Sequence, residues 1–491
     1  MDELNKKVRN ATKWSIAAEI AAKIISPLSN MILARILAPE AFGVVATVTM
    51  ITSFADMFTD AGFQKYLVQH EFEDKNDKNN STTVAFWTNL LISFFLWIMI
   101  IMAKDWLAEL VGNPGLGNVI AIACVSLPLT SFSSIQMALF RREFDFKTLF
   151  MVRIVAASIP IVVTIPLALF TRSYWALIIG TIVVNFSNAV ILTLRSPWKP
   201  SFYFDRQKLK EMFSFSCWTL LEQISIWLTS YADTFIVGVL LTPHYLGIYK
   251  TSMTTVNQIT TLITSATTPV LFSTLSRTQN DEQLFKDMFF KFQRNVSIFI
   301  LPLGTGIFLY RELVTDILLG NQWKEAANFI GLWGLTSTLT IIFSHFSSEV
   351  YRAKGKPRLS FLVQCSQLFV LIPVLILSSG QGFQALYTAR SLIRLELIVI
   401  NMIVMGILFK ITPLKQIKNI LPEAIATLAM SLFALGLKQI SNAIVWQLLS
   451  IILCIFFYFM CLIIFPNTRA EILQIISPIT YRIKKRLSLK I

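Results

Sequence analysis

Polar and charged side chains recur at helical spacing inside four otherwise apolar stretches of the sequence. Steps of three and four residues place side chains on one face of an α-helix. Because a charge inside a bilayer is costly, such faces are expected to point into a bundle interior or a water-filled cavity. The pattern predicts the hydrophilic chamber of a transporter. The four stripes are Ser15, Glu19, Ala22, Ser26 and Ser29; Thr49, Ser53, Asp56, Asp60 and Gln64; Glu222, Ser225, Thr229 and Asp233; and Lys250, Thr254, Gln258, Thr261 and Ser265.

The carboxylates in these stripes could carry protons or bind a cation. Asp56 and Asp60 lie one helical turn apart with no basic residue between them. Burial and a like-charged neighbour both raise the pKa of a carboxyl group. Glu222 and Asp233 in the third stripe could likewise carry protons or bind a cation. The alternative is that these acids only cap helices or pair with nearby groups, and the sequence does not decide between the two.

The cations suggest a site for a phosphate-bearing cargo. Glu19 and Lys23 are four residues apart, a spacing that favours a salt bridge. This couple could simply hold helices together, but the polar residues around it favour a cavity wall. Lys23 and Lys250 are the leading candidates for contact with phosphate. Further intramembrane cations are Arg35, Arg153, Arg390 and Arg394, the last two of which could form a structural cluster with Glu396.

These residues must be positioned by membrane helices. Of 491 residues, 55% are hydrophobic and only 14% are charged, whereas soluble proteins are about one quarter charged. Apolar runs of about 20 residues, long enough to cross a bilayer, recur along the chain. The class is therefore an all-α integral membrane protein. The net charge of +15 is spread between the spans, which favours contact with anionic lipid over nucleic acid.

About fourteen spans are expected. They cover roughly 12–37, 42–68, 82–103, 118–140, 148–170, 173–194, 211–241, 244–275, 292–312, 325–351, 359–378, 382–409, 420–437 and 443–465. Lys and Arg concentrate in alternate loops, which predicts that both termini are cytoplasmic.

An internal repeat divides the chain. Trp14 matches Trp218, Pro39 matches Pro243 and Gly43 matches Gly247, each 204 residues apart, in the strings ILAPEAFGVV and LLTPHYLGIY. Further matches are LVGN at 110–113 with LLGN at 318–321, and LFRREFDFKTLF at 139–150 with VYRAKGKPRLSF at 350–361. A parallel duplication of a six-helix lobe is predicted. The predicted domains are 1–205, 206–410, a helix pair at 411–465 and a basic cytoplasmic tail at 466–491.

Enzyme and cofactor signatures are missing from the sequence. No GxxxxGK[ST] phosphate loop occurs, and His70, His244 and His345 have no metal-ligand spacing. We therefore expect no enzyme activity, no metal and no cofactor.

Several strings resemble the Wzx-type polysaccharide exporters. They are ATKWSIA at 11–17, LARILAPEAFGVVA at 33–46, FADMFTDAGFQKYLVQ at 54–69, ALFRREFDFK at 138–147 and GNQWKEAANFIGLWGL at 320–335. The chain resembles colanic-acid and teichuronic-acid exporters, in the superfamily that also holds the MurJ flippases and the MATE drug exporters. Through these strings the resemblance extends to Lys13, Trp14, Arg35, Gly43, Asp56 and Gly62.

The resemblance implies two six-helix lobes related by a pseudo-two-fold axis, plus two C-terminal helices. It implies a cavity lined by spans 1, 2, 7 and 8, and alternating-access flipping of an undecaprenyl-diphosphate-linked oligosaccharide across the bacterial cytoplasmic membrane. The expected energy source is a gradient of H⁺ or Na⁺, or the membrane potential. Membrane lipids, a polysaccharide polymerase and glycosyltransferases are the expected partners. The predicted cavity residues are Glu19, Lys23, Asp56, Asp60, Glu222, Asp233 and Lys250.

Two other functions stay open at this point. In a MATE-like antiporter for drugs or cations, the acidic residues Asp56, Asp60, Glu222 and Asp233 would dominate the site. An integral-membrane glycosyltransferase or polymerase would need a sizeable extracytoplasmic loop with catalytic acids, and no loop in this sequence is long enough.

Overall fold

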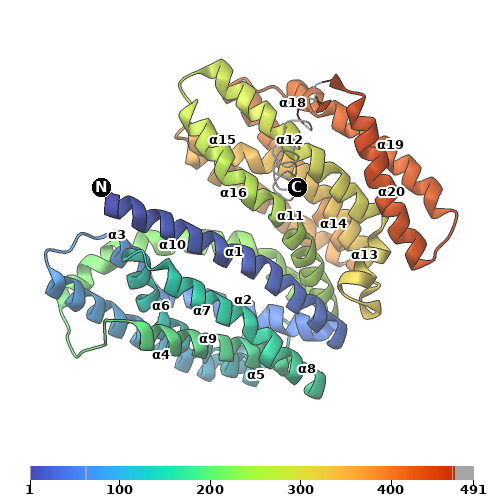
Figure 1. Ribbon diagram of the computed structural model, residues 1–491. Coiled ribbons are helices and arrows are strands. Elements are labelled where there is room, and N and C mark those ends of the chain that lie inside the picture. The colour runs from blue at the N-terminus through green and yellow to red at the C-terminus, as the bar shows by residue number, and fades with distance from the viewer. Residues whose placement is uncertain (1, 61–62, 467, 470, 472–491) are drawn as a thin grey trace, which may run out of the picture. The chain divides into compact units, whose positions relative to one another are not determined.

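The structure is a computed structural model that describes residues 2–60, 63–466, 468–469 and 471. Within the helices, the side chains of 2–13, 16, 60, 214–219, 221–222 and 357 lie outside the description. The described residues form helices and no strand (Figure 1). The prediction of an all-α protein is therefore confirmed.

The chain forms two compact units. Unit 1 comprises Met1–Thr251, Leu319–Gln322 and Leu375–Phe383. It holds α1 (Asp2–Ile36), α2 (Pro39–Asp60), α3 (Phe63–Gln69), α4 (Lys75–Leu110), α5 (Gly117–Ala123), α6 (Ser126–Arg142), α7 (Phe146–Ile159), the π-helical turn η1 (Pro160–Thr164), α8 (Ile165–Thr171), α9 (Trp175–Arg195), α10 (Arg206–Leu240) and the start of α11 (Pro243–Arg277).

Unit 2 comprises Ser252–Leu318, Trp323–Val374 and Gln384–Ile491. After the rest of α11 it holds α12 (Glu282–Leu309), α13 (Arg311–Leu318), α14 (Ala326–Thr340), the π-helical turn η3 (Ile341–His345), α15 (Phe346–Ala353), α16 (Pro357–Ser379), α17 (Phe383–Phe409), α18 (Pro413–Asn419), α19 (Leu421–Lys438) and α20 (Ile444–Ile463). The short 3₁₀ turn η2 (Asn321–Trp323) lies between α13 and α14.

Twelve segments in the described part of the chain are long and apolar enough to cross a membrane, and each coincides with one predicted span. The two other predicted spans are α10 and α11. Each is 35 residues long, which is ample at about 1.5 Å per residue. Both carry polar stripes, which lower their hydropathy, so the count of about fourteen stays a prediction.

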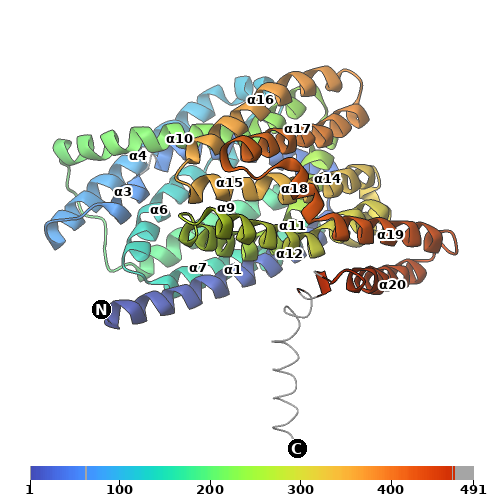
Figure 2. The same ribbon diagram turned by 90° about the horizontal axis from the view of Figure 1, so that it is seen from above.

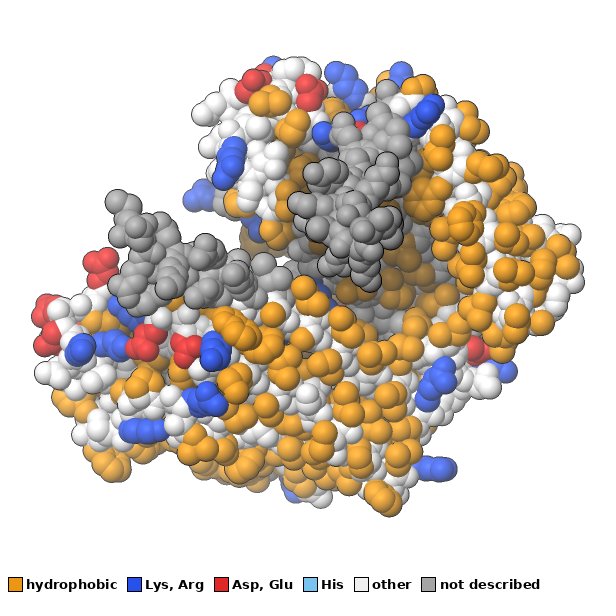
Figure 3. All heavy atoms as spheres, in the orientation of Figure 1, with side chains coloured by type: hydrophobic (Ala, Val, Ile, Leu, Met, Phe, Trp, Pro, Cys, Tyr) orange, Lys and Arg blue, Asp and Glu red, His pale blue; other side chains and the backbone are white. Residues whose placement is uncertain are grey.

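Surface chemistry agrees with a membrane protein. Figure 3 shows hydrophobic side chains over the middle of unit 1, whereas charged side chains gather toward the end that carries α3. At the edge of unit 2, α19 and α20 lie side by side as an antiparallel pair (Figures 1 and 2). These two helices pack on α12 through a cluster that includes Ile298, Ala426 and Tyr458.

Aspartates fix where several helices begin. The side chain of Asp205 accepts hydrogen bonds from the backbone N–H groups of Gln207 (2.8 Å) and Lys208 (3.3 Å) at the start of α10. Asp74, Asp145 and Asp281 cap α4, α7 and α12 in the same way. Such caps satisfy N–H groups that have no partner within the helix.

Residues related by the repeat meet each other in unit 1. A Cβ atom added to Gly43 would lie 1.8 Å from the carbonyl oxygen of Pro243, and one added to Gly247 would lie 1.8 Å from that of Pro39. Nearby, Nδ1 of His244 lies 2.6 Å from Oε1 of Glu40, and these two residues are also 204 apart. Reciprocal contacts of this kind are what a two-fold axis between duplicated segments produces.

The LVGN and LLGN loops, which are also related by the repeat, make reciprocal contacts of the same kind. A Cβ on Gly112 would lie 2.7 Å from Cα of Val239, and a Cβ on Gly320 would lie 3.2 Å from Cγ of Arg35. Arg35 and Val239 are again 204 residues apart, so each loop packs on the helix that begins the other repeat. Both glycines have positive φ angles, a conformation that other residues rarely adopt.

The compact units do not follow the repeat. Contacts group α10 with the first half of the chain, since α10 packs against α2 through Trp227 and Phe54, whose ring centroids are 4.8 Å apart. The repeat is a similarity between two stretches of sequence, whereas each compact unit is defined by the residues that contact one another. The domain boundaries at 205 and 410 therefore stay a prediction.

Candidate functional site

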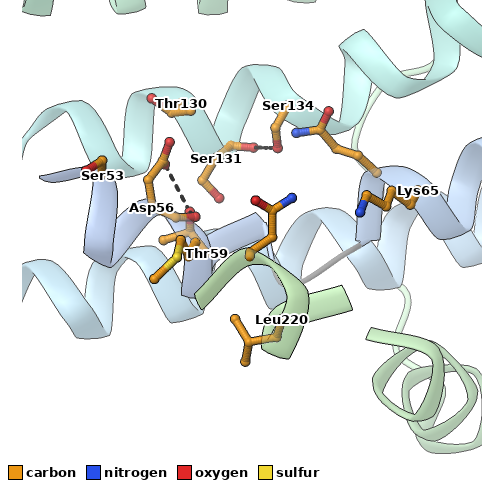
Figure 4. A pocket seen from close by; sticks show the side chains of 11 residues that line it. Ser53, Asp56, Thr59, Lys65, Thr130, Ser131, Ser134 and Leu220 are labelled. Carbon is orange, nitrogen blue, oxygen red and sulfur yellow. Dashed lines mark hydrogen bonds between the residues drawn. The ribbon is translucent and has the colours of Figure 1, made fainter. Parts of the chain in front are cut away.

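The described part of unit 1 contains a polar cavity of about 270 Å³. Segments from α2, α3, α6 and α10 form its wall (Figure 4). Two lining residues are apolar and nine are polar, so a wet space lies within a bundle of membrane helices. The lining residues are Ser53, Asp56, Met57, Thr59, Gln64, Lys65, Thr130, Ser131, Ser134, Leu220 and Gln223.

Asp56, a predicted cavity residue, supplies the carboxylate of this wall. The hydroxyl of Thr59, one turn further along α2, donates a hydrogen bond to Oδ1 of Asp56 (3.1 Å). The second stripe also contributes Ser53 and Gln64 to the lining. Its face thus borders a cavity, as its spacing predicts, while any binding role of Asp56 stays a prediction.

The hydroxyls of α6 were not predicted as part of the site. Ser131 is 1% exposed, and its Oγ has no hydrogen-bond partner among the described residues. Ser134 donates to the carbonyl of Ser131 (3.0 Å) and accepts from Nδ2 of Asn89 (2.9 Å). The available signal was the run SLPLTSFSS at 126–134, in which five of nine residues carry hydroxyls.

Lys65 is a second residue that the stripes did not identify as functional. It follows Gln64 on α3 and lines the same cavity as Asp56 (Figure 4). One acid and one base are therefore the charged side chains in the described lining. With both ionised, their formal charges cancel.

Glu19 and Lys23 form the predicted salt bridge on α1, at 3.4 Å. Glu19 also pairs with Arg153 of α7, at 2.9 Å. One acid thus bridges two bases on two helices, which leaves a formal net charge of +1. The interpretation as a structural couple gains a physical basis from the contact with α7, yet the surplus positive charge still suits a phosphate.

Asp233 of α10 is buried and accepts a hydrogen bond from the hydroxyl of Tyr249 in α11 (2.9 Å). The hydroxyl of Thr234 donates to its other oxygen (3.2 Å). Lys250 places its Nζ 5.2 Å from the centroid of the Tyr231 ring, a favourable contact between a cation and a π-system. The predicted acid and base of the third and fourth stripes therefore lie at the α10–α11 junction.

Trp227 connects this junction to the cavity. Its Nε1 donates to Oγ of Ser53 (3.1 Å) in the cavity wall, and its ring stacks on that of Tyr231, 5.5 Å away. The tryptophan thus lies between the polar cavity and the contact of Tyr231 with Lys250. The stripe spacing did not reveal it, because a tryptophan in a membrane helix is usually read as packing.

The structure thus distributes the predicted residues over three places in unit 1. Asp56 lines the cavity, Glu19 and Lys23 lie between α1 and α7, and Asp233 and Lys250 lie where α10 meets α11. The side chains of Asp60 and Glu222 lie outside the described residues.

In unit 2, Arg390 and Arg394 form the expected cluster on α17. Their guanidinium carbons lie 5.0 and 4.1 Å from the centroid of the Trp333 ring. Arg394 also donates to Oγ of Ser337 (2.5 Å), and Trp333 donates to Oδ1 of Asn257 (3.3 Å). Glu396 lies on the same helix, and its Oε2 has no hydrogen-bond partner among the described residues.

Two relatives of this chain carry names from bacterial polysaccharide and lipopolysaccharide biosynthesis. The succinoglycan biosynthesis transport protein ExoT of Rhizobium meliloti is 24% identical over 70% of this chain and 68% of its own length. The lipopolysaccharide biosynthesis protein WzxC of Escherichia coli is 20% identical over 76% of this chain and 75% of its own length.

Two solved structures share the fold. The lipid II flippase MurJ, in an inward closed conformation, matches with a TM-score of 0.72 at 15% identity, covering 93% of this chain and 99% of MurJ. An inward-facing MATE multidrug transporter of the MOP superfamily matches with a TM-score of 0.57 at 13% identity, covering 79% of this chain and 94% of the transporter. At such identities the likeness concerns the fold alone.

The family assignment rests on sequence. The family model described as polysaccharide biosynthesis protein matches residues 32–328, which is more than half of the chain, and the resemblance to Wzx-type exporters is confirmed. The chain belongs to the polysaccharide biosynthesis protein family.

Proposed function

We propose that this protein is a flippase that moves an undecaprenyl-diphosphate-linked oligosaccharide from the cytoplasmic to the outer leaflet of the bacterial cytoplasmic membrane. The observation that carries the proposal is the cavity lined by hydroxyls, amides, Asp56 and Lys65 within membrane helices of a polysaccharide biosynthesis protein. The sugars of such a cargo need hydrogen-bonding partners inside the membrane, while its lipid tail can stay in the bilayer.

The diphosphate needs cations. Lys23 and Arg153 share the single carboxylate of Glu19, so this cluster keeps one positive charge to offer. Lys250 lies at the α10–α11 junction, over the Tyr231 ring. We infer that these two places hold the diphosphate, because charge-assisted hydrogen bonds to phosphate are strong.

Transport requires the cargo to face each side in turn. We propose alternating access driven by a gradient of H⁺ or Na⁺, with no cofactor, and with both termini cytoplasmic as the loop charges predict. Glycosyltransferases would build the cargo and a polymerase would use it, so both are the proposed partners. Nucleic acid has no role in this scheme.

A MATE-like antiporter remains the alternative function. Only the fold favours it, since ExoT and WzxC carry names from polysaccharide and lipopolysaccharide biosynthesis. Deletion of the gene separates the two functions. Loss of surface polysaccharide with unchanged resistance to a cationic dye supports the flippase, whereas dye sensitivity with normal polysaccharide supports the antiporter.

Charge reversal tests the proposed contacts with diphosphate. We expect Lys23→Glu and Lys250→Glu each to lower surface polysaccharide by about tenfold or more, because a charge-assisted hydrogen bond contributes about 1.5–3 kcal/mol. Membrane levels of both variants should stay normal. Lys104→Glu is the control, because Lys104 bonds to Asn118 near the far end of α4. Wild-type polysaccharide in both variants would remove these lysines from the mechanism.

A further inference from the structure

The charge of the unit 1 cavity argues for a neutral ligand. Asp56 would repel a diphosphate, and Lys65 would repel a metal cation. Gln64 and Gln223 can each donate and accept hydrogen bonds. The described part of the lining mixes donors with acceptors and carries no formal net charge, which suits a polyhydroxylated molecule.

The size of the cavity limits the ligand further. Its volume of about 270 Å³ is just below the range of about 300–1,000 Å³ seen for pockets that enclose drug-sized ligands. An oligosaccharide headgroup is too large for this space. A single sugar ring with its hydroxyl groups is of suitable size.

The hydrogen bonds of the wall show where a ligand is needed. The hydroxyl of Ser53 donates to the carbonyl of Met50 (3.0 Å), and that of Thr59 donates to the carbonyl of Asp56 (2.8 Å). Ser131 differs, because it is buried and its Oγ has no partner among the described residues. A buried hydroxyl without a partner is costly, and a hydroxyl of a bound ligand would satisfy it.

We propose that this cavity binds one sugar ring of the translocated glycan. This inference rests on the proposed function and names where part of its cargo binds. Ser131, Asp56, Gln64 and Gln223 exchange hydrogen bonds with the hydroxyls of the ring. Trp227 fixes the position of Ser53 in the wall, because its Nε1 donates a hydrogen bond to Oγ of Ser53. The diphosphate binds outside this cavity, at Lys23 and Lys250.

Binding to the purified full-length protein in lipid nanodiscs tests this site. The probes are a ten-carbon prenyl diphosphate alone and the same lipid carrying glucose, galactose or N-acetylglucosamine. For the wild type, we expect at least one sugar to tighten binding by about tenfold or more, because a ring makes several hydrogen bonds. Ser131→Ala should lose about fivefold of that gain, and Ser131→Leu, which fills the cavity, should lose all of it.

Matched variants keep the test interpretable. Ser133→Ala is the control, because Ser133 is not one of the lining residues and its hydroxyl already donates to the backbone carbonyl of Thr130 (3.0 Å). Gln223→Ala probes the part of the wall that α10 supplies if Ser131→Leu does not fold. Binding of the bare prenyl diphosphate should be equal in all variants.

The outcomes separate the two proposals. If prenyl diphosphate binds but no sugar adds affinity, or if Ser131→Ala and Gln223→Ala keep the full gain, the sugar site is overturned while the flippase stands. If neither form of lipid binds to the wild type, the proposed function itself is overturned. Stabilisation by NaCl over choline chloride that disappears in Ser131→Ala would instead make this a cation site, and would also overturn the proposal.

Discussion

At the scale of single residues, the contrast between Asp56 and Ser131 is instructive. A carboxylate in an apolar helix is conspicuous, because its burial is costly without compensation, so the sequence alone identified Asp56 as a cavity residue. Ser131 lines the same cavity, but serine and threonine occur widely in membrane helices as packing residues. Only the structure shows that its hydroxyl has no partner among the described residues.

Ion pairing could be only partly predicted from spacing. The four-residue step from Glu19 to Lys23 predicted their salt bridge. The second partner, Arg153, lies 134 positions away from Glu19 on α7, and no local rule connects the two. The same holds for Tyr249, whose hydroxyl bonds to Asp233 across two helices.

Asp205 supports a prediction about pH. Hydrogen bonds from the backbone N–H of Gln207 and then of Lys208 hold the pKa of this carboxyl below its usual range, which is about 3.9 in unfolded chains. A carboxyl with a lowered pKa in the folded state stabilises the fold above the unfolded pKa. That contribution is lost as the pH falls through the folded pKa.

The variant Asp205→Asn isolates this effect. Asparagine also caps helices but does not titrate, so its contribution is the same at every pH. We expect the wild type to have the higher unfolding temperature near pH 7, and this advantage to shrink below about pH 4. Thermal unfolding of both proteins in detergent measures it, and a difference that does not change with pH would contradict the account.

At the scale of elements, the main feature is the close crossing of α2 and α11 at Gly43 and Gly247. The repeat matched Gly43 with Gly247 and Pro39 with Pro243, but similarity along a chain does not reveal that matched residues touch. The contact itself explains the glycines, because a side chain on either would collide with a backbone carbonyl. Backbone atoms cannot move aside as a flexible side chain can.

Gly43→Ala should therefore be strongly destabilising. A Cβ 1.8 Å from the carbonyl oxygen of Pro243 forces the helices apart, and such overpacking typically costs about 1–3 kcal/mol or more. The matched control is Gly436→Ala in α19, where an added Cβ meets nothing within 4 Å and alanine is favoured in a helix. The unfolding temperature in detergent should fall for Gly43→Ala only, and equal stability of the two variants would show that the crossing is looser than described.

Hydropathy locates the apolar middle of a span but not the ends of its helix, since the third predicted span, 82–103, lies inside α4 (Lys75–Leu110). The structure adds what hydropathy does not show. The fifth span contains the π-helical turn Pro160–Thr164 before α8, a local departure that a hydropathy profile does not show.

At the scale of the whole molecule, composition predicted a helical membrane transporter, and family membership confirms the resemblance to polysaccharide exporters. The arrangement of the cavity could not be predicted, since four helices from distant parts of the chain meet there. The repeat predicts a duplication but not how its copies pack. Within unit 1, the LVGN loop contacts α10 at Val239 and the LLGN loop contacts α1 at Arg35.

The account's central claim is that this protein carries a sugar headgroup through the membrane. The most direct measurement uses sealed vesicles that contain the purified protein and a prenyl diphosphate-linked sugar with a fluorescent label on the sugar. Dithionite, which does not cross the bilayer, bleaches only label in the outer leaflet. With a Na⁺ or H⁺ gradient imposed, we predict that label from the inner leaflet becomes accessible in vesicles with wild-type protein and far more slowly with Lys250→Glu. Bleaching that stops at the outer-leaflet fraction, as in protein-free vesicles, would contradict the claim.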